Sequence, residues 1–144
     1  MARVDDVVAA ALKQARAIDT WKLQKLLYYC QAWHLVWEGD PLFRARIEAW
    51  ANGPVVPAVY RKHRGRFRVD RWPCGDASRL TPAETGSVKA VLGFYGKKSG
   101  YELSALTHRE APWKRARKGL IEGEPGHQEI TLESMLDYYG GLVK

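Results

Sequence analysis

Hydrophobic residues recur every three or four positions along the first part of the chain, which is the spacing of one helical face. The pattern predicts a helix over residues 4–17 and a second over residues 20–38, with Thr20 as its N-cap and Gly39 as its left-handed stop. The second helix is apolar over most of its circumference and leaves mainly three residues for an outer side: Lys22, Lys25 and Tyr29. We therefore expect it at the centre of the fold, with other elements packed around it.

Strict alternation of polar and apolar side chains marks residues 43–50 and, again, residues 67–72. Because alternation is typical of a half-buried strand, we predict that these two strands pair in one small sheet. A short helix is expected between them, over residues 55–63. Gly53 and Pro54 suit its start, because glycine tolerates a strained turn and proline at a first helical position gives up no needed hydrogen bond.

Helix-start signals divide the second half of the chain. Two capping boxes, at residues 81–84 and 99–102, each begin a helix, and Pro112 fits the start of another over residues 113–118. A glycine-containing loop over residues 119–130 separates this helix from the last one. The last helix is predicted to turn four side chains inward: Leu132, Met135, Leu136 and Tyr139.

These signals together predict an α+β fold that is predominantly α-helical. We expect five to six helices around the central helix, at about residues 20–38, and a small two- or three-stranded sheet. The length of 144 residues fits one domain, and the chain shows no internal repeat and no linker. Residues 1–144 are therefore expected to form a single domain.

The net charge of +7 comes from two segments. Residues 61–71 hold six Lys or Arg against one Asp, and residues 109–118 hold five against one Glu, so the rest of the chain is slightly acidic. Basic and aromatic residues interleave in both segments, as they do on nucleic-acid surfaces, although an acidic protein would exploit the same charge. No helix-turn-helix, zinc-finger or RRM signature accompanies them, which makes nucleic acid the less favoured partner.

Cysteine and histidine offer little chemistry in this sequence. Cys30 and His34 are four apart on a helix and could face a metal with His63 and Cys74, or form a nucleophilic pair. Both lie on an apolar stripe, however, and the spacing of a structural zinc site is absent, so a buried thiol and a hydrogen-bonded core histidine are the favoured interpretation. A Cys30–Cys74 disulfide is disfavoured for the same reason.

Motifs of common active sites are also missing. The chain has no phosphate-binding loop, dinucleotide fingerprint or nucleophile elbow, and its carboxylates gather at helix starts, where capping explains them. The segment "THRE", residues 107–110, is interpreted first as a structural corner, then as a partner contact, and last as a catalytic group. We expect no enzymatic activity, no metal and no cofactor.

The sequence gives no sign of membrane insertion or export. No apolar run approaches the ~20 residues of a spanning helix, and charged residues interrupt the N-terminus where a signal peptide would be apolar. We expect a cytoplasmic protein with no membrane partner.

Three stretches together resemble the Panacea domain, also called the SocA-like domain. They are "LQKLLYYCQAWHLVWEGDPLF" (23–43), "EAWANGPVVPAVY" (48–60) and "LTHREAPW" (106–113), in this order and spacing. The resemblance runs from about residue 20 to residue 118, and the middle stretch is the most specific.

The resemblance implies an antitoxin, encoded beside a toxin and neutralising it by direct binding. Toxins paired with the family include translation inhibitors and small alarmone-synthetase-like enzymes. One member is an adaptor that hands its toxin to a Clp protease, so a Clp or Lon protease is a further partner to consider. The family brings no catalytic residues to this chain.

We hypothesise that the Gly-Pro corner fixes a short helix against the preceding strand and thereby builds a rigid toxin-binding patch. The residues predicted to bind the toxin are Trp50, Tyr60, Arg61, Arg64, Arg66, His108 and Trp113. Those predicted to shape the corner are Gly53, Pro54 and Pro57. In the alternative interpretation, Trp50 only packs under the helix at residues 55–63.

Overall fold

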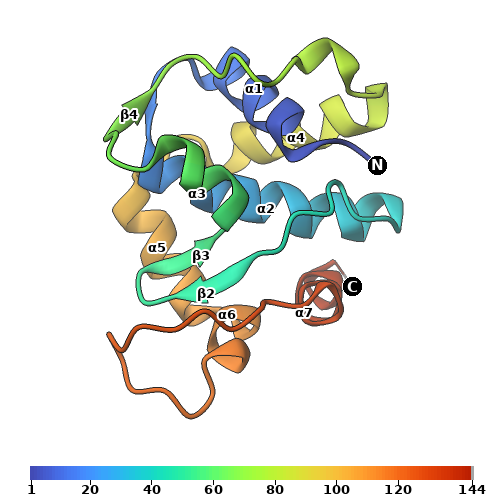
Figure 1. Ribbon diagram of the computed structural model, residues 1–144. Coiled ribbons are helices and arrows are strands. Elements are labelled where there is room, and N and C mark those ends of the chain that lie inside the picture. The colour runs from blue at the N-terminus through green and yellow to red at the C-terminus, as the bar shows by residue number, and fades with distance from the viewer. Residues whose placement is uncertain (144) are drawn as a thin grey trace.

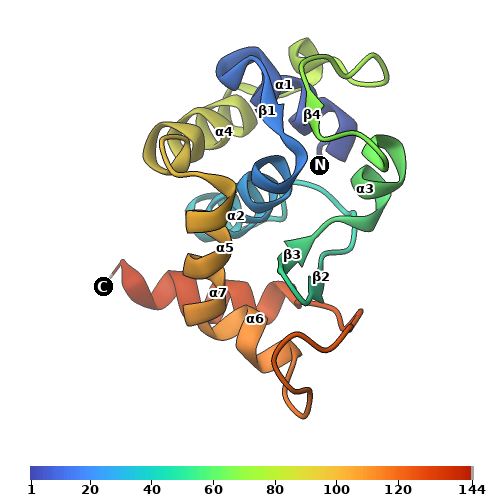
Figure 2. The same cartoon turned by 90° about the vertical axis from the view of Figure 1, so that its left-hand side faces the viewer.

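Helix α2 (Thr20–Glu38) crosses the middle of the computed structural model, which describes residues 1–143 (Figure 1). Two helices lie on one side of it: α1 (Val4–Ala15) and α4 (Pro82–Tyr95). Three lie on the opposite side: α5 (Gly100–Arg109), α6 (Ala111–Ala116) and α7 (Leu132–Leu142). A hairpin and helix α3 (Pro57–His63) cover a further side of α2, as Figure 2 shows after a quarter turn. The predicted central position of this helix is confirmed.

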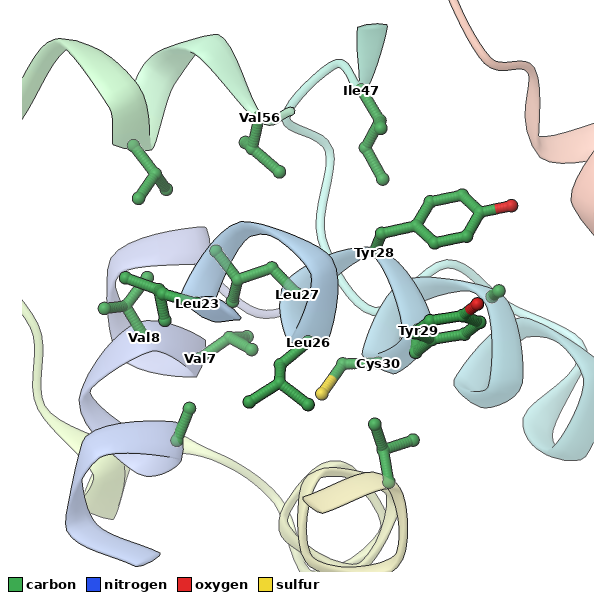
Figure 3. Close-up of a cluster of buried hydrophobic side chains, with 14 of the residues drawn as sticks. Val7, Val8, Leu23, Leu26, Leu27, Tyr28, Tyr29, Cys30, Ile47 and Val56 are labelled. Carbon is green, nitrogen blue, oxygen red and sulfur yellow. The ribbon is translucent and has the colours of Figure 1, made fainter. Parts of the chain in front are cut away.

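The core is built on α2, and every residue from Leu23 to Cys30 is buried. Figure 3 shows Leu23, Leu26 and Leu27 leaving the helix in different directions, with Val7 and Val8 of α1 nearby. The predicted outer side of α2 is therefore wrong for two of its three residues, Lys25 and Tyr29. Helix α5 packs on α2, and the chain supplies polar acceptors for both of these buried side chains.

The ends of the helices follow their capping residues closely. Both capping boxes form as predicted, and Gly39 ends α2 with a φ of 81°. The N-cap of α2 is Asp19 and not Thr20, because the Asp19 carboxylate accepts a hydrogen bond from the Lys22 backbone amide at 2.8 Å. Two other predicted bounds shift: α1 ends at Ala15, and α6 spans 111–116.

The strands form two separate antiparallel pairs. Strand β1 (Ile18–Asp19) pairs with β4 (Arg68–Val69), and β2 (Glu48–Trp50) pairs with β3 (Gly53–Val55). The predicted pairing of residues 43–50 with residues 67–72 is wrong, because a two-residue turn at Ala51 and Asn52 folds β3 straight back onto β2. Burial still alternates along residues 43–50 as expected.

Helix α3 begins two residues later than predicted. Pro57 occupies its first turn, whereas Pro54 lies in β3 and does not begin the helix. Gly53 has a φ of 123°, a conformation that residues with a Cβ rarely adopt, so the glycine is needed for the hairpin rather than for the helix start.

The α+β, predominantly helical fold class is confirmed. Residues 1–143 contain seven α-helices and a one-turn 3-10 helix, η1 (Ala77–Arg79), against the five or six helices expected. Helix α7 buries Met135 and Tyr139 as predicted, but Leu132 and Leu136 are exposed, because only a narrow stripe of this peripheral helix meets α2 and α6. None of these helices is long and apolar enough to cross a membrane.

Candidate binding pocket

Two aromatic side chains meet where β2 and α3 approach each other. The rings of Trp50 and Tyr60 lie edge to face, with centroids 4.9 Å apart and an interplanar angle of 67°. Both residues are half-buried, and the indole Nε1 of Trp50 donates to Glu48 Oε1 at 2.9 Å. Trp50 therefore packs against α3, as the alternative interpretation expected, yet both residues also line a cavity.

The cavity has a volume of about 570 Å³, within the range of small-molecule sites. It lies between the start of α2, the β2–β3 hairpin, α3 with the loop after it, and a second loop at residues 125–127. Its aromatic lining consists of Trp21, Trp50, Tyr60 and Phe67, and its basic lining of Lys25, His63, Arg64, Arg66 and His127. No Asp or Glu of the described residues lines it.

Lys25 lines the cavity as a buried cation. Its side chain is only 3% exposed, and its Nζ donates one hydrogen bond, to the carbonyl of Pro54 at 3.1 Å. No carboxylate oxygen in residues 1–143 lies within 4.0 Å of this nitrogen. Burial lowers the pKa of Lys25 to about 8, although the charge of Asp19 opposes the shift. An ammonium has three donors, so this one retains donors for another acceptor.

The Gly-Pro motif forms the seat of this lysine. A Cβ on Gly53 would lie 2.6 Å from Lys25 Cε, so only glycine leaves room for the side chain to pass. The next residue, Pro54, supplies the carbonyl that accepts from Nζ. Helical periodicity placed Lys25 on an outer side, so the sequence did not predict it as a cavity residue. A lysine between the buried apolar residues Leu23 and Leu26 was the available signal.

A buried hydrogen-bond network holds the adjacent wall of the cavity. The side chain of Gln24 accepts from the backbone amide of Val56 at 2.7 Å, and its Nε2 lies 2.9 Å from Nε2 of His63. Because the Gln24 amide donates in this arrangement, His63 Nε2 must be an unprotonated acceptor. Burial lowers the pKa of His63, which agrees with a neutral ring.

Backbone hydrogen bonds fix the loop after α3. The Thr20 amide donates to the carbonyl of Phe67 at 2.9 Å, and Thr20 Oγ1 donates to that of Arg66 at 3.2 Å. We call the surface made by Arg61, Arg64, Arg66 and Phe67 the α3 rim. All four residues are exposed, Phe67 by 77%.

The structure divides the predicted toxin-binding residues into three positions. Four line the cavity: Trp50, Tyr60, Arg64 and Arg66. Arg61 is exposed on α3 and lines no part of the cavity. His108 and Trp113 lie behind the hairpin, stacked on each other at 4.0 Å, and Trp113 Nε1 donates to the Trp50 carbonyl at 2.9 Å. These last two support the site from the rear.

The two basic segments differ in how their charge is used. In residues 109–118, Arg117 is buried, donates to the Ala49 carbonyl at 2.9 Å and lies over the Trp113 ring, while Arg115 pairs with Asp137 at 3.3 Å. In residues 61–71, Lys62 pairs with Asp5 at 2.7 Å. The arginines of the α3 rim form none of the salt bridges found among residues 1–143, so their charge faces solvent and the cavity mouth.

Three other candidate groups, Cys30, His34 and Glu110, are buried within the core. Nδ1 of His34 lies 2.7 Å from Ser87 Oγ, which confirms the prediction of a hydrogen-bonded core histidine, and burial raises the pKa of the Cys30 thiol to about 12. In the corner at residues 107–110, Glu110 accepts hydrogen bonds from Tyr29 and Tyr139. The structural interpretation of this corner therefore accounts for its carboxylate.

Comparison with known proteins shows that most of this sequence matches a protein family. Residues 23–114 match the family described as "Antitoxin SocA-like, Panacea domain". Antitoxin SocA of Caulobacter vibrioides (strain NA1000 / CB15N) is 46% identical over 54 residues, which is 35% of this chain and 29% of that protein. The aligned part thus spans less than a third of the relative's length. No solved structure matches the chain.

Proposed function

Because this chain belongs to the family of SocA-like antitoxins with a Panacea domain, we propose that it neutralises a cognate toxin by binding it directly. The observation that carries the proposal is the family match over residues 23–114, which contain Lys25, the β2–β3 hairpin and the α3 rim. The named relative, an antitoxin, supports the same role. The role that we propose is one of binding in the cytoplasm, without catalysis.

The α3 rim is the surface that we propose for the toxin. Arginine and aromatic residues are enriched among those that dominate binding energy, and the rim offers exposed arginines beside Phe67. Thr20 anchors the loop and Trp50 packs against Tyr60, so little conformational freedom is lost on binding. A partner with an acidic surface would complement this rim. Translation inhibitors and small alarmone-synthetase-like enzymes are the toxin classes that the family resemblance suggests.

Co-expression with the neighbouring open reading frame tests the proposal. We expect the neighbour to arrest growth, and this chain to restore growth and to copurify with the neighbour's product. Rescue without a complex would contradict direct neutralisation and favour a proteolytic adaptor, for which rescue should disappear in strains lacking Clp or Lon. A non-toxic neighbour would contradict the proposed pairing.

A charge-reversal pair tests the surface. Arg61→Glu with Arg64→Glu should weaken toxin binding by about tenfold or more and leave the melting temperature nearly unchanged, because both side chains are exposed. The matched control is Arg109→Glu with Lys114→Glu, which makes the same charge change at exposed positions of the other basic segment. Equal weakening by both pairs would mean that net charge, and not the α3 rim, governs binding.

Nucleic acid is the second candidate, because the exposed Phe67 stands between exposed arginines in the sequence. Fluorescence anisotropy with generic single- and double-stranded oligonucleotides would test it at about 50 and about 200 mM salt. Tight binding that falls steeply with salt and is abolished by the Arg61/Arg64 reversal would favour this function over the antitoxin.

A further inference from the structure

The cavity beside the α3 rim has an unusual charge balance for a partly enclosed surface. A buried charge normally has a partner, because desolvating it alone costs several kcal/mol. Lys25 has a carbonyl and no carboxylate within reach in residues 1–143, and two exposed arginines, Arg64 and Arg66, share its cavity. No acidic residue of the described chain lines the space. An anion that entered the cavity would supply the missing counter-charge.

The two histidines that line the cavity already have side-chain partners within the chain. His63 lies on the hairpin side with its Nε2 occupied by the Gln24 amide, and His127 has its Nδ1 3.4 Å from Glu48 Oε1. The positive groups that remain for a ligand are therefore Lys25 within the cavity and the two arginines at its mouth.

The aromatic lining indicates what the anion is attached to. The volume of about 570 Å³ exceeds what an inorganic ion alone would fill. Trp21, Trp50 and Tyr60 line the space, and aromatic side chains bind flat rings by stacking or by edge-to-face contact. A planar ring therefore complements the aromatic walls in shape, and an anionic group complements Lys25 in charge.

We propose that this cavity binds a small organic anion with a planar ring, its anionic group paired with Lys25 and its ring held by the aromatic wall. Mononucleotides and aromatic carboxylates both carry this chemistry. The site belongs to the chain itself and stands whether or not the chain binds a toxin. Gly53 and Pro54 then serve the ligand, because they make room for Lys25 and orient its Nζ.

Calorimetric titration of the full chain, together with quenching of tryptophan fluorescence, tests the proposal. The probes are adenosine and guanosine 5′-monophosphate, benzoate, uncharged adenosine and inorganic phosphate. We expect saturable binding of the nucleotides or of benzoate, and binding at least about tenfold weaker for adenosine and phosphate, each of which lacks one half of the chemistry. Comparison of the nucleotides with benzoate shows whether the cavity prefers mononucleotides or aromatic carboxylates.

Substitutions test whether ligand binding depends on Lys25. Lys25→Met keeps an unbranched side chain as far as Cε and removes the ammonium group, so binding should fall by about tenfold or more. Lys22→Met is the matched control, since Lys22 lies on the same helix, donates to the Gly96 carbonyl and lines no part of the cavity. If Lys25→Met does not fold, Arg64→Gln with Arg66→Gln should weaken binding at exposed positions without harming the fold.

Two results would overturn the proposal. One is the absence of binding by every charged ring compound at ~1 mM, at which Kd values of weak specific sites are still detected; the cavity would then be left for a side chain of a partner protein. The other is binding that is unchanged by both the Lys25 and the Arg64/Arg66 variants.

Discussion

At the scale of single residues, Lys25 connects stability to binding. Its folded pKa of about 8 lies below the ordinary lysine pKa of 10.5, so between these two pH values the unfolded chain binds more protons than the folded one. The contribution of Lys25 to stability is therefore present above about pH 10.5, and it is lost as pH falls through 8. Asp19 moderates the effect. Burial, and to a smaller extent the charge of Lys25, lowers the pKa values of His63 and His108.

We expect Lys25→Met to be more stable than the parent chain at pH 7, by about 1 to 3 kcal/mol, because it removes an unpaired buried charge. The difference should shrink between about pH 8 and pH 10 as the lysine loses its proton. Urea denaturation of both chains across this pH range measures the difference in their free energies of unfolding. Both chains contain the same tyrosines, so the contribution of tyrosine titration cancels in that difference. A variant that is less stable at every pH would show that the bond to Pro54 outweighs the buried charge.

Glu110 is the opposite case, a buried acid whose folded pKa is raised by burial. Its contribution to stability is present below the unfolded pKa and is lost as pH rises through the folded one. Glu110 Oε1 accepts from Tyr29 at 2.6 Å and from Tyr139 at 2.7 Å. We expect Glu110→Ala to cost about 3 kcal/mol, since two buried phenols lose their acceptor, and Glu110→Gln to cost less and to flatten the pH dependence. Denaturation at pH 5 and pH 8 distinguishes these outcomes.

At the scale of elements, the β2–β3 hairpin depends on one glycine. Gly53→Ala forces a Cβ into a strained conformation and against Lys25, so we expect a loss of about 1 to 3 kcal/mol. Gly86→Ala is the control, because Gly86 lies in α4 with open space around it and should gain about 0.5 to 1 kcal/mol. Thermal unfolding of both variants tests the pair, and equal stability of the two would contradict a special role for Gly53.

Local signals predicted the helices better than the pairing of strands. The capping boxes at Thr81 and Ser99 act within one turn, so the sequence contains all that they need. Pairing depends on distant segments: the other edge of β2 receives residues 128–130, whose Ile130 amide donates to the Ile47 carbonyl at 2.8 Å. Periodicity also misplaced Lys25, because nothing within α2 shows that the Pro54 carbonyl approaches it.

At the scale of the whole molecule, the cavity gathers residues from four parts of the chain that no short motif contains. Trp50 and Tyr60 were predicted because both lie in the most specific stretch that resembles the Panacea domain, whereas His63 and His127 lie outside all three stretches. His108 and Trp113 share that family pattern but support the hairpin instead of lining the cavity. The family pattern therefore includes residues that support the hairpin as well as residues that line the cavity.

A comparison of two variants separates these roles. Trp113 is 8% exposed and holds the Trp50 carbonyl, so Trp113→Ala should lower stability by about 3 to 5 kcal/mol and weaken toxin binding through the displaced hairpin. Arg61→Glu with Arg64→Glu should weaken binding alone. The melting temperature of each variant measures its stability. Copurification of the toxin, at a temperature where both variants are folded, measures binding. Full loss of toxin binding by Trp113→Ala with unchanged stability would instead place Trp113 in contact with the toxin.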